Sequence, residues 1–375
     1  MEKTKILHAN DDNYNLGGAF ILTYRVEKYL RKFGFSYDYV TMDHFCVDSE
    51  KYAIDSDDKT YSANLRKNKF IGHVLLPLYV DRILKRENYK IIHIDTDSAW
   101  KALLYAMPAR KNGVQVLVHS HSTGIDGKCK GIKNFCEFWA KRILIHYCNV
   151  YIACSEDAAK WIVPPNSNIN VKVIPNGIEL KEFYYDSFER KEYREKYNLG
   201  KSIVLGNVGL LTENKNQEYL IEMLECLLAK KYDVKLLLVG KDDTSYGEKI
   251  KNIVRQKGLE AEVIFTGSTS NVRQLMNAMD IYIQPSIFEG FGLVSVEAQA
   301  TGLMTFVSQS LPKESVICNW AQRFNLVSEK NVIEKAVCDY IFDEDARLKK
   351  IVNKKYGIEY MAEQEVDIYK SLIYK

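Results

Sequence analysis

Two glutamates separated by seven residues, Glu289 and Glu297, are the side chains of this sequence best placed to do chemistry. The residues before them, 280–286, form a short apolar run around Pro285 that predicts a buried strand. The residues 293–300 have apolar positions at helical spacing. The turn between this strand and this helix therefore consists of Glu289, Gly290, Phe291 and Gly292.

Such a turn suits a ligand that carries both an anion and hydroxyl groups. Glycines at 290 and 292 allow the backbone to approach a ligand closely. The start of a helix offers unpaired N–H groups and positive potential to an anion. Glu297 falls further along the helix, where a carboxylate accepts hydrogen bonds from vicinal hydroxyls such as those of a ribose. A chance pair of surface glutamates would explain this block alone, but further motifs follow in order.

The block from Phe288 to Gly302 resembles the Glu-x7-Glu signature of retaining glycosyltransferases with the GT-B fold, those of family 4. It is most similar to the bacterial enzymes of capsule and exopolysaccharide assembly. The resemblance implies a nucleotide-sugar donor, most often UDP-linked. It places Glu289 at the donor sugar near the reacting carbon and Glu297 at the ribose. The intervening Gly290, Phe291, Gly292 and Leu293 are then donor-binding residues.

A second block lies between a strand that starts at 203 and a helix over 217–228. The family carries a glycine here, then an arginine, then a Lys-Asn pair that opens the helix, and the two cations hold the donor diphosphate. Gly209, Lys215 and Asn216 match this pattern, but Leu210 stands where the family has arginine. The resemblance therefore predicts that Arg273 or another cation compensates, or that activity is reduced. The alternative for Lys215 is a solvated lysine at a helix start.

The remaining matches lie in the first half of the chain. His119 and His121 follow the apolar strand 114–118, and alignment on that strand gives His121 the family's role at the donor sugar. An imidazole there can donate a hydrogen bond to a sugar hydroxyl. Gly17 and Gly18 lie in the first strand-to-helix loop, where the family lets backbone approach the donor phosphate or the acceptor. A Gly-Gly pair alone is also an ordinary turn.

Strands alternate with helical segments in two series, which predicts an α/β protein with two doubly wound, Rossmann-like domains. In the GT-B fold these domains face each other across a cleft, and a C-terminal helix crosses back to the first domain. We predict an acceptor-side domain over residues 1–178, a donor-binding domain over 179–355 and the returning helix over 356–375. The charged, tyrosine-rich stretch 179–200 is interpreted as a connector between the domains.

The composition excludes several other classes of protein. A net charge of +3, with no RNA-binding signature, gives no reason to expect nucleic acid. The eight cysteines show no zinc-ligand spacing and are interpreted as buried free thiols. The N-terminus enters a strand at once and no apolar run approaches membrane-spanning length, so we expect a cytoplasmic protein.

The pair Asp95 and Asp97 resembles the Asp-x-Asp metal motif of a different glycosyltransferase fold. Here the pair follows a strand of the first half without that fold's context. We interpret both residues as loop carboxylates and predict no metal. No cofactor is expected either, because the nucleotide sugar is a substrate.

Two segments of the first half, 61–90 and 127–147, combine basic residues with aromatic and aliphatic residues. Such faces fit peripheral contact with the anionic inner face of the plasma membrane. Ordinary solvated helix faces would have the same composition.

The resemblance thus implies a metal-independent, retaining glycosyltransferase of hexosyl or N-acetylhexosaminyl groups. Its donor is a nucleotide-diphosphate sugar, with UDP favoured, and its acceptor a carbohydrate, such as a lipid-linked glycan of capsule or exopolysaccharide assembly. The alternative is a catalytically impaired GT-B subunit that binds a glycan or a partner glycosyltransferase, for which Leu210 is the main indication. A nicotinamide-dependent enzyme is disfavoured, because neither opening strand is followed by Gly-x-Gly-x-x-Gly.

Overall fold

The computed structural model describes residues 3–10, 18–43, 58–65, 69–123, 130–329 and 331–374. The chain divides into two compact units. The first unit comprises Met1–Gly177 together with Gly357–Lys375, and the second comprises Ile178–Tyr356. Each junction differs by one residue from the predicted boundary.

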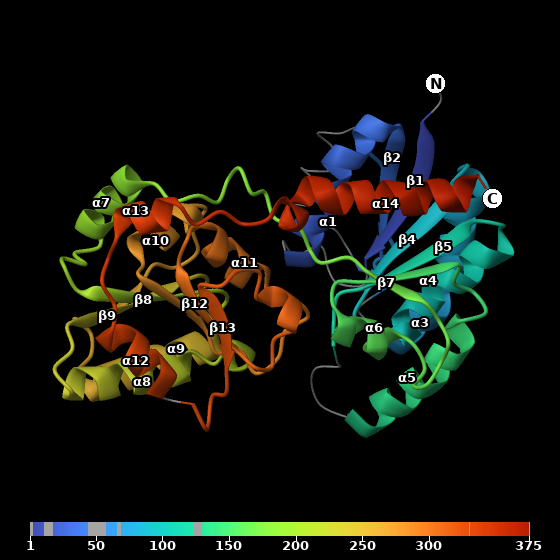
Figure 1. Cartoon of the computed structure of the whole chain (residues 1–375). Coiled ribbons are helices and arrows are strands. Elements are labelled where there is room, and N and C mark those ends of the chain that lie inside the picture. Colours follow the sequence, from blue (N-terminus) through green and yellow to red (C-terminus); the bar gives the residue numbers. More distant parts are fainter. Residues whose placement is uncertain are drawn as a thin grey trace. The chain divides into compact units, whose positions relative to one another are not determined.

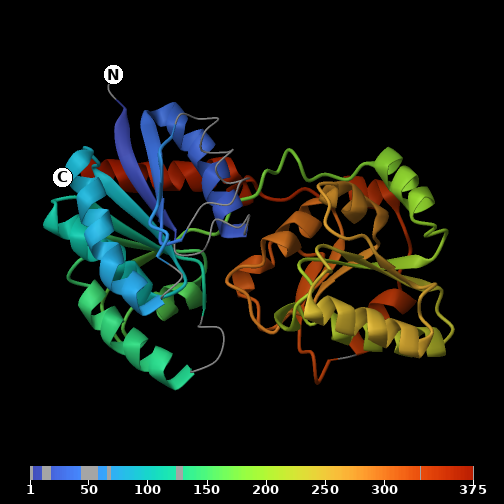
Figure 2. The ribbon, with the colours of Figure 1, turned by 180° about the vertical axis from the view of Figure 1, so that it is seen from behind.

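The first unit is built on a parallel sheet whose described strands have the order β3-β2-β1-β4-β5-β6-β7. These strands are β1 (Thr4–Asn10), β2 (Phe35–Thr41), β3 (Thr60–Ser62), β4 (Ile91–Thr96), β5 (Gln115–Ser120), β6 (Val150–Ala153) and β7 (Val171–Val173). The helices are α1 (Gly18–Leu30), the 3-10 turn η1 (Arg31–Phe33), α3 (Lys69–Arg86), α4 (Ala99–Lys111), α5 (Lys130–Leu144), α6 (Glu156–Ile162) and α14 (Ile358–Ile373). Helices α3, α4 and α5 pack side by side, and α1 packs with α14 on the other side of the sheet (Figures 1 and 2).

The C-terminal helix α14 belongs to the first unit, as the sequence predicted. Its buried positions recur at helical spacing and include Met361, Val366, Tyr369 and Leu372. The Tyr369 ring packs edge-on against Phe35 of β2, with 5.2 Å between the ring centroids. The last helix therefore completes the core of a unit that the first half of the chain begins.

The second unit is also a parallel sheet, with the described strands in the order β10-β9-β8-β11-β12-β13. These strands are β8 (Ile203–Val208), β9 (Val234–Val239), β10 (Val263–Phe265), β11 (Ile281–Gln284), β12 (Met304–Ser308) and β13 (Ala321–Phe324). The helical elements are α7 (Ser187–Lys196), η2 (Glu213–Lys215), α8 (Gln217–Ala229), α9 (Ser245–Lys257), α10 (Val272–Ala278), α11 (Leu293–Ala300), η3 (Lys313–Ser315), α12 (Asn331–Cys338), α13 (Glu344–Leu348) and η4 (Lys354–Tyr356). Helices α8 and α9 lie on one face of the sheet, and α10 and α11 on the other (Figure 1). The prediction of two doubly wound α/β domains is therefore confirmed.

Three predictions from the sequence are wrong in detail. The stretch 179–200 is not a plain connector, because it contains α7, which packs against α10 inside the second unit. Short strands β3 and β13 were not predicted. Of the described cysteines all six are free thiols, but Cys136, Cys226 and Cys338 are exposed. These three cysteines lie on amphipathic helices or at their ends. On such a helix the apolar residues next to a cysteine in the sequence lie on a different face, so they do not predict that the cysteine is buried.

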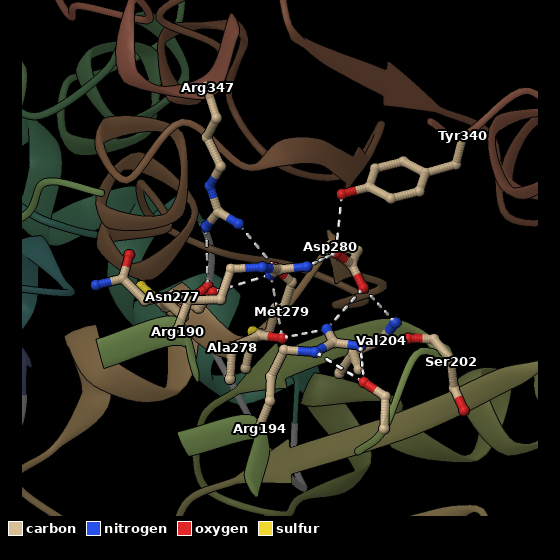
Figure 3. Close-up of polar contacts among 12 residues, drawn as sticks. Arg190, Arg194, Ser202, Val204, Asn277, Ala278, Met279, Asp280, Tyr340 and Arg347 are labelled. Carbon is tan, nitrogen blue, oxygen red and sulfur yellow. Dashed lines mark hydrogen bonds and ion pairs between the residues drawn. The ribbon is translucent and has the colours of Figure 1, made fainter. Parts of the chain in front are cut away.

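A buried carboxylate, Asp280, joins many elements of the second unit at the start of β11 (Figure 3). It accepts hydrogen bonds from Arg190 Nη2 at 2.6 Å, Arg194 Nη1 at 3.1 Å and the Tyr340 hydroxyl at 2.8 Å. The backbone N–H of Val204, in β8, donates to the same carboxylate at 2.8 Å. One side chain therefore connects α7, β8, β11 and the segment after α12.

The three arginines around this carboxylate outnumber it, and backbone carbonyls supply the missing negative potential. Arg347 Nη1 donates to the Met279 carbonyl at 2.9 Å and its Nη2 to the Met276 carbonyl at 3.1 Å. Arg190 Nη1 also donates to the Met279 carbonyl, at 2.9 Å. These carbonyls end α10, where the helix dipole favours a cation. Burial and the nearby Arg190 still lower the pKa of Arg347 to about 10.

We predict that Asp280→Asn strongly destabilises the second unit, because it leaves buried guanidinium groups without their counter-charge. Removing one partner of a buried ion pair costs roughly 3–5 kcal/mol in the free energy of unfolding. Thermal and denaturant unfolding would measure the loss. Asp243→Asn is the matched control, because the Asp243 side chain is 72% exposed and only meets Lys241 at 3.6 Å. Equal unfolding midpoints for the two variants would contradict the prediction.

Candidate functional site

The strand order of each sheet reverses at one point, and the predicted residues gather there. In the second unit β8 and β11 are neighbours, and the chain leaves them toward opposite sides of the sheet. The loop after β8 leads to Lys215, and the loop after β11 carries Glu289. Ligands of open α/β sheets bind at this position, beyond the carboxyl ends of the strands.

Two asparagines fix the turn after β11. The Asn214 side chain accepts from the N–H of Phe288 at 3.1 Å and donates to its carbonyl at 3.0 Å. Asn216 Nδ2 donates to the Pro285 carbonyl at 3.1 Å. Asn216 adopts a left-handed conformation, with φ of 56°, which asparagine tolerates better than most residues. The two loops are thus tied together before any ligand is present.

Lys215 and Glu289 form an ion pair across these loops. Gln284 Nε2, at the end of β11, also donates to Glu289 Oε1, at 3.3 Å. The Lys215 and Glu289 side chains are 25% and 15% exposed. An ammonium group and a carboxylate are therefore both accessible at one point, although the sequence places them 74 positions apart.

The helix α11 starts at this turn as predicted, over Leu293–Ala300. Gly292 precedes it with φ of +83°, and a Cβ there would come within 2.8 Å of Leu311 Cδ2. A side chain at this position would therefore be strained both by the backbone conformation and by contact. Phe291 is buried beside it and anchors the turn in the core.

Glu297 is half-buried in α11. Its charge, like that of Glu289, affects the buried Tyr282. Burial raises the pKa of Tyr282 well above its usual value, and the charges of Glu289 and Glu297 raise it further. Glu289 lies in the turn that leads into α11, Glu297 lies within that helix, and Lys215 pairs with Glu289.

The loop after β8 carries Leu210 at the position where the family has an arginine. The Leu210 side chain is 44% exposed, so it does not fill a core position. Arg273, the predicted substitute, pairs with Glu189 and stacks on Tyr184, 4.4 Å from the ring centroid. Its guanidinium therefore has a structural role in the α7–α10 contact. The backbone of Lys241 lies beside the loop, because its carbonyl accepts from Leu211 N–H at 3.0 Å, and its ammonium group lies 3.6 Å from Asp243.

The first unit carries a buried cluster of histidines and carboxylates near the carboxyl ends of β1, β4 and β5. The prediction that Asp95 is a loop carboxylate is wrong, because it lies within β4 and is 3% exposed. Asp97, two residues later, is the exposed one. His119 lies within β5 and His121 directly after it, with their ring centroids 4.1 Å apart.

Burial alone would raise the pKa of Asp95, but His8 and His121 lower it well below its usual value. Conversely, Asp95 outweighs the effect of burial and raises the pKa of both His8 and His121 to about 10. Burial and the charge of His8 lower the pKa of His93 to about 3. These shifts favour the protonated form of His8 and His121, which contact Asp95, and the neutral form of His93.

Three of these groups lie close enough to share a metal ion. His93 Nε2, His119 Nδ1 and Asp95 Oδ1 are 3.3 to 3.7 Å from one another. Both oxygens of Asp95 already accept hydrogen bonds, from His8 Nε2 and from His121 Nε2, so a metal ion at this position would compete with these contacts.

The remaining predicted residues are Gly17 and Gly18. Gly17 lies outside the described residues. Gly18 is the first residue of α1. Gly209 follows β8 and lies against Gly240, where a Cβ would come within 2.2 Å of the Gly209 carbonyl oxygen. The glycine at 240 was not predicted, and its contact allows the β8 and β9 loops to approach closely.

Sequence reasoning missed most of the buried cluster, including His8, Glu27, His93 and Glu365. These residues lie on β1, α1, β4 and α14 and line one small cavity of about 10 Å³. The local signal for these residues is a polar side chain at a position where a buried strand or the buried face of a helix would carry an apolar one.

The fold and the site together define a class of protein. Two doubly wound units, with a lysine, two glutamates and a glycine-rich turn at one switch point, are typical of GT-B glycosyltransferases. Residues 16–182 match the family described as Glycosyltransferase Family 4, and residues 189–355 match the family of Glycosyl transferases group 1. The chain belongs to the family-4-like glycosyltransferases of the GT-B fold.

Known proteins agree with this assignment. The UDP-Gal:alpha-D-GlcNAc-diphosphoundecaprenol alpha-1,3-galactosyltransferase of Escherichia coli is 27% identical over 293 residues, 75% of this chain and 72% of that enzyme. The capsular polysaccharide biosynthesis glycosyltransferase CapM of Staphylococcus aureus is 30% identical over 181 residues, 46% of each chain. The crystal structure of Anabaena HepE in complex with UDP matches the fold with a TM-score of 0.80 at 17% identity, covering 98% of this chain and 100% of that one.

The buried Glu365 generates a prediction about pH. Burial, with the charge of Asp95, raises the pKa of Glu365 from its ordinary 4.5 to about 8. The folded protein therefore holds this proton more tightly than the unfolded chain. Its contribution to stability is complete below pH 4.5 and is lost as the pH rises through about 8.

Glu365→Gln should therefore unfold at a higher temperature than the wild type above pH 8, with a smaller difference near pH 5. Thermal unfolding across this pH range measures the effect. Glu363→Gln on the exposed face of the same helix is the control and should keep the wild-type pH dependence. A Glu365→Gln curve parallel to the wild type at all pH values would show that Glu365 ionises normally.

Proposed function

We propose that the protein is a retaining glycosyltransferase that transfers a hexosyl or N-acetylhexosaminyl group from a UDP-sugar to a carbohydrate acceptor. The acceptor class that we propose is a lipid-linked glycan of capsule or exopolysaccharide assembly. The observation that supports the proposal is the occurrence of Lys215, Glu289 and Glu297 in and beside one glycine-rich turn. In this proposal Lys215 contacts the diphosphate, Glu289 the sugar and Glu297 the ribose.

The donor and the acceptor class rest on the relatives as well as on the site. The E. coli relative is named for a UDP-galactose donor and a diphosphoundecaprenol-linked acceptor. HepE, which has the same fold, was crystallised with UDP. Neither the transferred sugar nor the linkage follows from these names, because loop residues around the pocket set both.

The proposed chemistry relies on positioning and electrostatics. As the bond from the sugar to the diphosphate breaks, negative charge grows on the diphosphate. Lys215 and the N–H groups at the start of α11 are placed to stabilise it. Glu289 holds the sugar near its reacting carbon, and the acceptor hydroxyl attacks on the face that the diphosphate leaves. We assign His121 of the first unit to a hydroxyl of the donor sugar.

A panel of nucleotide sugars, assayed for release of nucleotide diphosphate, tests this function. The product formed with the best donor should keep the anomeric configuration of the donor, as determined by NMR. Turnover should persist in EDTA, because the cations of the site are side chains. Inversion at the anomeric carbon, or loss of turnover in EDTA with recovery in manganese, would overturn the corresponding part of the proposal.

Leu210 supports a second candidate function, a catalytically impaired subunit that binds a glycan or a partner glycosyltransferase. The exposed leucine leaves the diphosphate with one cation fewer than the family pattern. The intact Lys215, Glu289 and Glu297 favour an active enzyme. Purified protein that binds UDP but neither hydrolyses nor transfers any donor would favour the impaired subunit.

Glu297→Gln should weaken donor binding, because a neutral amide accepts ribose hydrogen bonds less strongly than a carboxylate. The expected loss is ~1.5–3 kcal/mol for a hydrogen bond to a charged group. The donor Michaelis constant and the affinity for UDP should change together. An unchanged donor Michaelis constant would defeat the ribose assignment.

Leu210→Arg should strengthen binding of both donor and UDP, because it restores a charge-assisted contact to the diphosphate. Calorimetric titration with UDP measures this. If Lys241 already serves as the second cation, Lys241→Gln lowers the affinity for UDP and Leu210→Arg restores it in the double variant. Tighter binding in neither background would show that the loop does not meet the diphosphate.

We also propose that the first unit attaches the enzyme to an anionic membrane surface. No described helix is long and apolar enough to cross a bilayer. Helices α3 and α5 instead expose large apolar side chains: Val74, Leu75, Leu78, Phe135, Phe138, Trp139 and Ile143. Arg82, Lys85 and Arg86 are exposed on α3. Lys141 differs from the prediction, because it is buried against the Trp161 ring at 3.8 Å.

Replacing Phe135 and Trp139 together by glutamate should abolish cosedimentation with vesicles that contain phosphatidylglycerol. Burying each large apolar side chain contributes roughly 1.5–3 kcal/mol to binding. Phe188→Glu is the control, because Phe188 is 76% exposed but lies on α7 in the second unit. Failure of the wild type to bind such vesicles would remove the membrane proposal.

A further inference from the structure

The second unit contains a cavity that lies apart from the glycine-rich turn. Its volume is about 300 Å³, and it is lined by residues from three parts of the chain: 180–185, the end of α11 and 347–352. Helix α11 begins directly after the glycine-rich turn, whereas Ala300, its last residue, lines the cavity. The cavity and the candidate donor site therefore lie at opposite ends of one helix.

The walls of this cavity are apolar, and so is its rim. Phe183, Tyr185 and Val352 line it as buried side chains. Leu348 and Ile351 line it as well, but they are 53% and 84% exposed. Exposed apolar side chains around a concave site provide a surface that a ligand with an apolar part can cover.

The polar groups of the cavity carry positive charge. Arg347 and Lys350 line it, and none of the described residues that line it is acidic. Among the residues that the structure describes, neither cation forms an ion pair with a carboxylate. Their N–H groups donate to backbone carbonyls instead, including that of Thr301 for Arg347 and that of Gly302 for Lys350. Both positive charges are therefore without a counter-charge.

The pKa values of nearby groups indicate the same sign of charge at the wall. Burial lowers the pKa of Lys350, and the charge of Arg347 lowers it further. Burial raises the pKa of Tyr185, and the charges of Arg190 and Arg347 oppose this rise. Each of these two cations acts on Tyr185 more strongly than either nearby carboxylate does. The excess of arginine around Asp280 thus extends to the cavity, and a partly buried excess charge attracts an anion.

Lys350 is the cation that a ligand can reach. Its side chain is half-buried, whereas that of Arg347 is 5% exposed and donates to backbone carbonyls (Figure 3). An ammonium group has three N–H donors. Within the described part of the chain, the Lys350 ammonium donates to the Gly302 carbonyl at 3.0 Å, which leaves donors for a ligand. Lys350 can therefore contact a head group, and Arg347 adds positive potential.

We propose that this cavity binds a small amphipathic carboxylate, with its head group at Lys350 and its apolar part against the buried aromatic wall. At about 30 Å³ for each water-sized group, the cavity has room for roughly ten non-hydrogen atoms. One reachable ammonium among apolar walls suits a singly charged head group better than a doubly charged phosphate, because each further charge must leave water. The site does not depend on the proposed transferase function.

The position of the cavity gives its occupation a consequence. The N–H of Ile178 donates to the Tyr356 carbonyl at 3.0 Å, so the two chain segments that connect the units leave the second unit side by side. Residues 180–185 follow one connection, and residues 347–352 precede the other. A ligand that contacts both sets of residues holds the two segments together, so it should slow backbone hydrogen exchange in both.

Octanoate is the probe, because it has about the expected size, an apolar chain and a single carboxylate. In calorimetric titration of the full-length protein, octanoate should bind at least about tenfold more tightly than acetate, which lacks the chain, or octan-1-ol, which lacks the charge. Hydrogen-exchange mass spectrometry should show slower exchange with octanoate in peptides that cover 178–185 and 347–356. Exchange in α3 and α5, and binding of UDP, should not change.

Two substitutions test the contacts. Lys350→Gln should weaken octanoate binding about tenfold or more, because it removes the charged donor. Lys349→Gln is the matched control, because Lys349 is exposed and does not line the cavity. Leu348→Asp changes an exposed residue, so it should fold, and its carboxylate at the rim should weaken octanoate binding by repulsion. Val327→Asp, at an 82% exposed position outside the cavity, is its control.

Equal affinity of Lys350→Gln and Lys349→Gln for octanoate would overturn the proposal, and so would unchanged affinity in folded Leu348→Asp. Slower exchange in α3 and α5 alone would assign the probe to the apolar face of the first unit and would also overturn it. Displacement of octanoate by UDP would place the probe at the donor site and have the same consequence. Neither the titration with octanoate nor the exchange measurement uses a sugar donor, so failure of the transferase function would not alter their results.

Discussion

The ion pairs of Asp280 are the interaction on which the arrangement of the second unit depends. The carboxylate lies at the start of β11 and holds the N–H of Val204 in β8, so it sets how these neighbouring strands are aligned. The opposite ends of the same two strands lead to Lys215 and Glu289. A shift of β11 along β8 would therefore separate the lysine from the glutamate. The fixed charges at one edge of the sheet thus preorganise the polar groups at the other edge.

The arginines around Asp280 are stable there for a specific reason. A single buried carboxylate cannot neutralise Arg190, Arg194 and Arg347. Carbonyl groups at the end of α10, which carry the negative end of the helix dipole, accept hydrogen bonds from Arg190 and Arg347. Carbonyls of Ser202 and Thr301 accept further N–H groups of Arg194 and Arg347. Residues that look like a charged connector in the sequence therefore become part of the core of the unit.

The two units use the same architecture for different chemistry. Both place polar side chains where the order of the parallel strands reverses. In the second unit these groups, Lys215 and Glu289, are partly exposed. In the first unit they are buried, and each charge has a partner of opposite sign or a hydroxyl. Only His121 lies at the edge of that network, and α14 closes its inner side with Tyr369 and Glu365.

The sequence by itself determined the alternation of strands and helices, the two units, the returning helix and the turn of Glu289 to Gly292. These features follow from local patterns: apolar runs, helical spacing and glycines at a helix start. It also placed Lys215 in the loop after β8 and Glu297 in the helix after the turn, because their motifs are contiguous. Only the tertiary structure decided that Asp95 is buried and bonded to several side chains, and that Arg273 pairs with Glu189. It also decided that 179–200 forms part of a core and that the backbone of Lys241 contacts Leu211. Each of these depends on residues far apart in the chain that meet through strand order and helix packing. A carboxylate or a guanidinium has the same appearance in the sequence whether it meets water, a ligand or a buried partner, and only the fold supplies that partner.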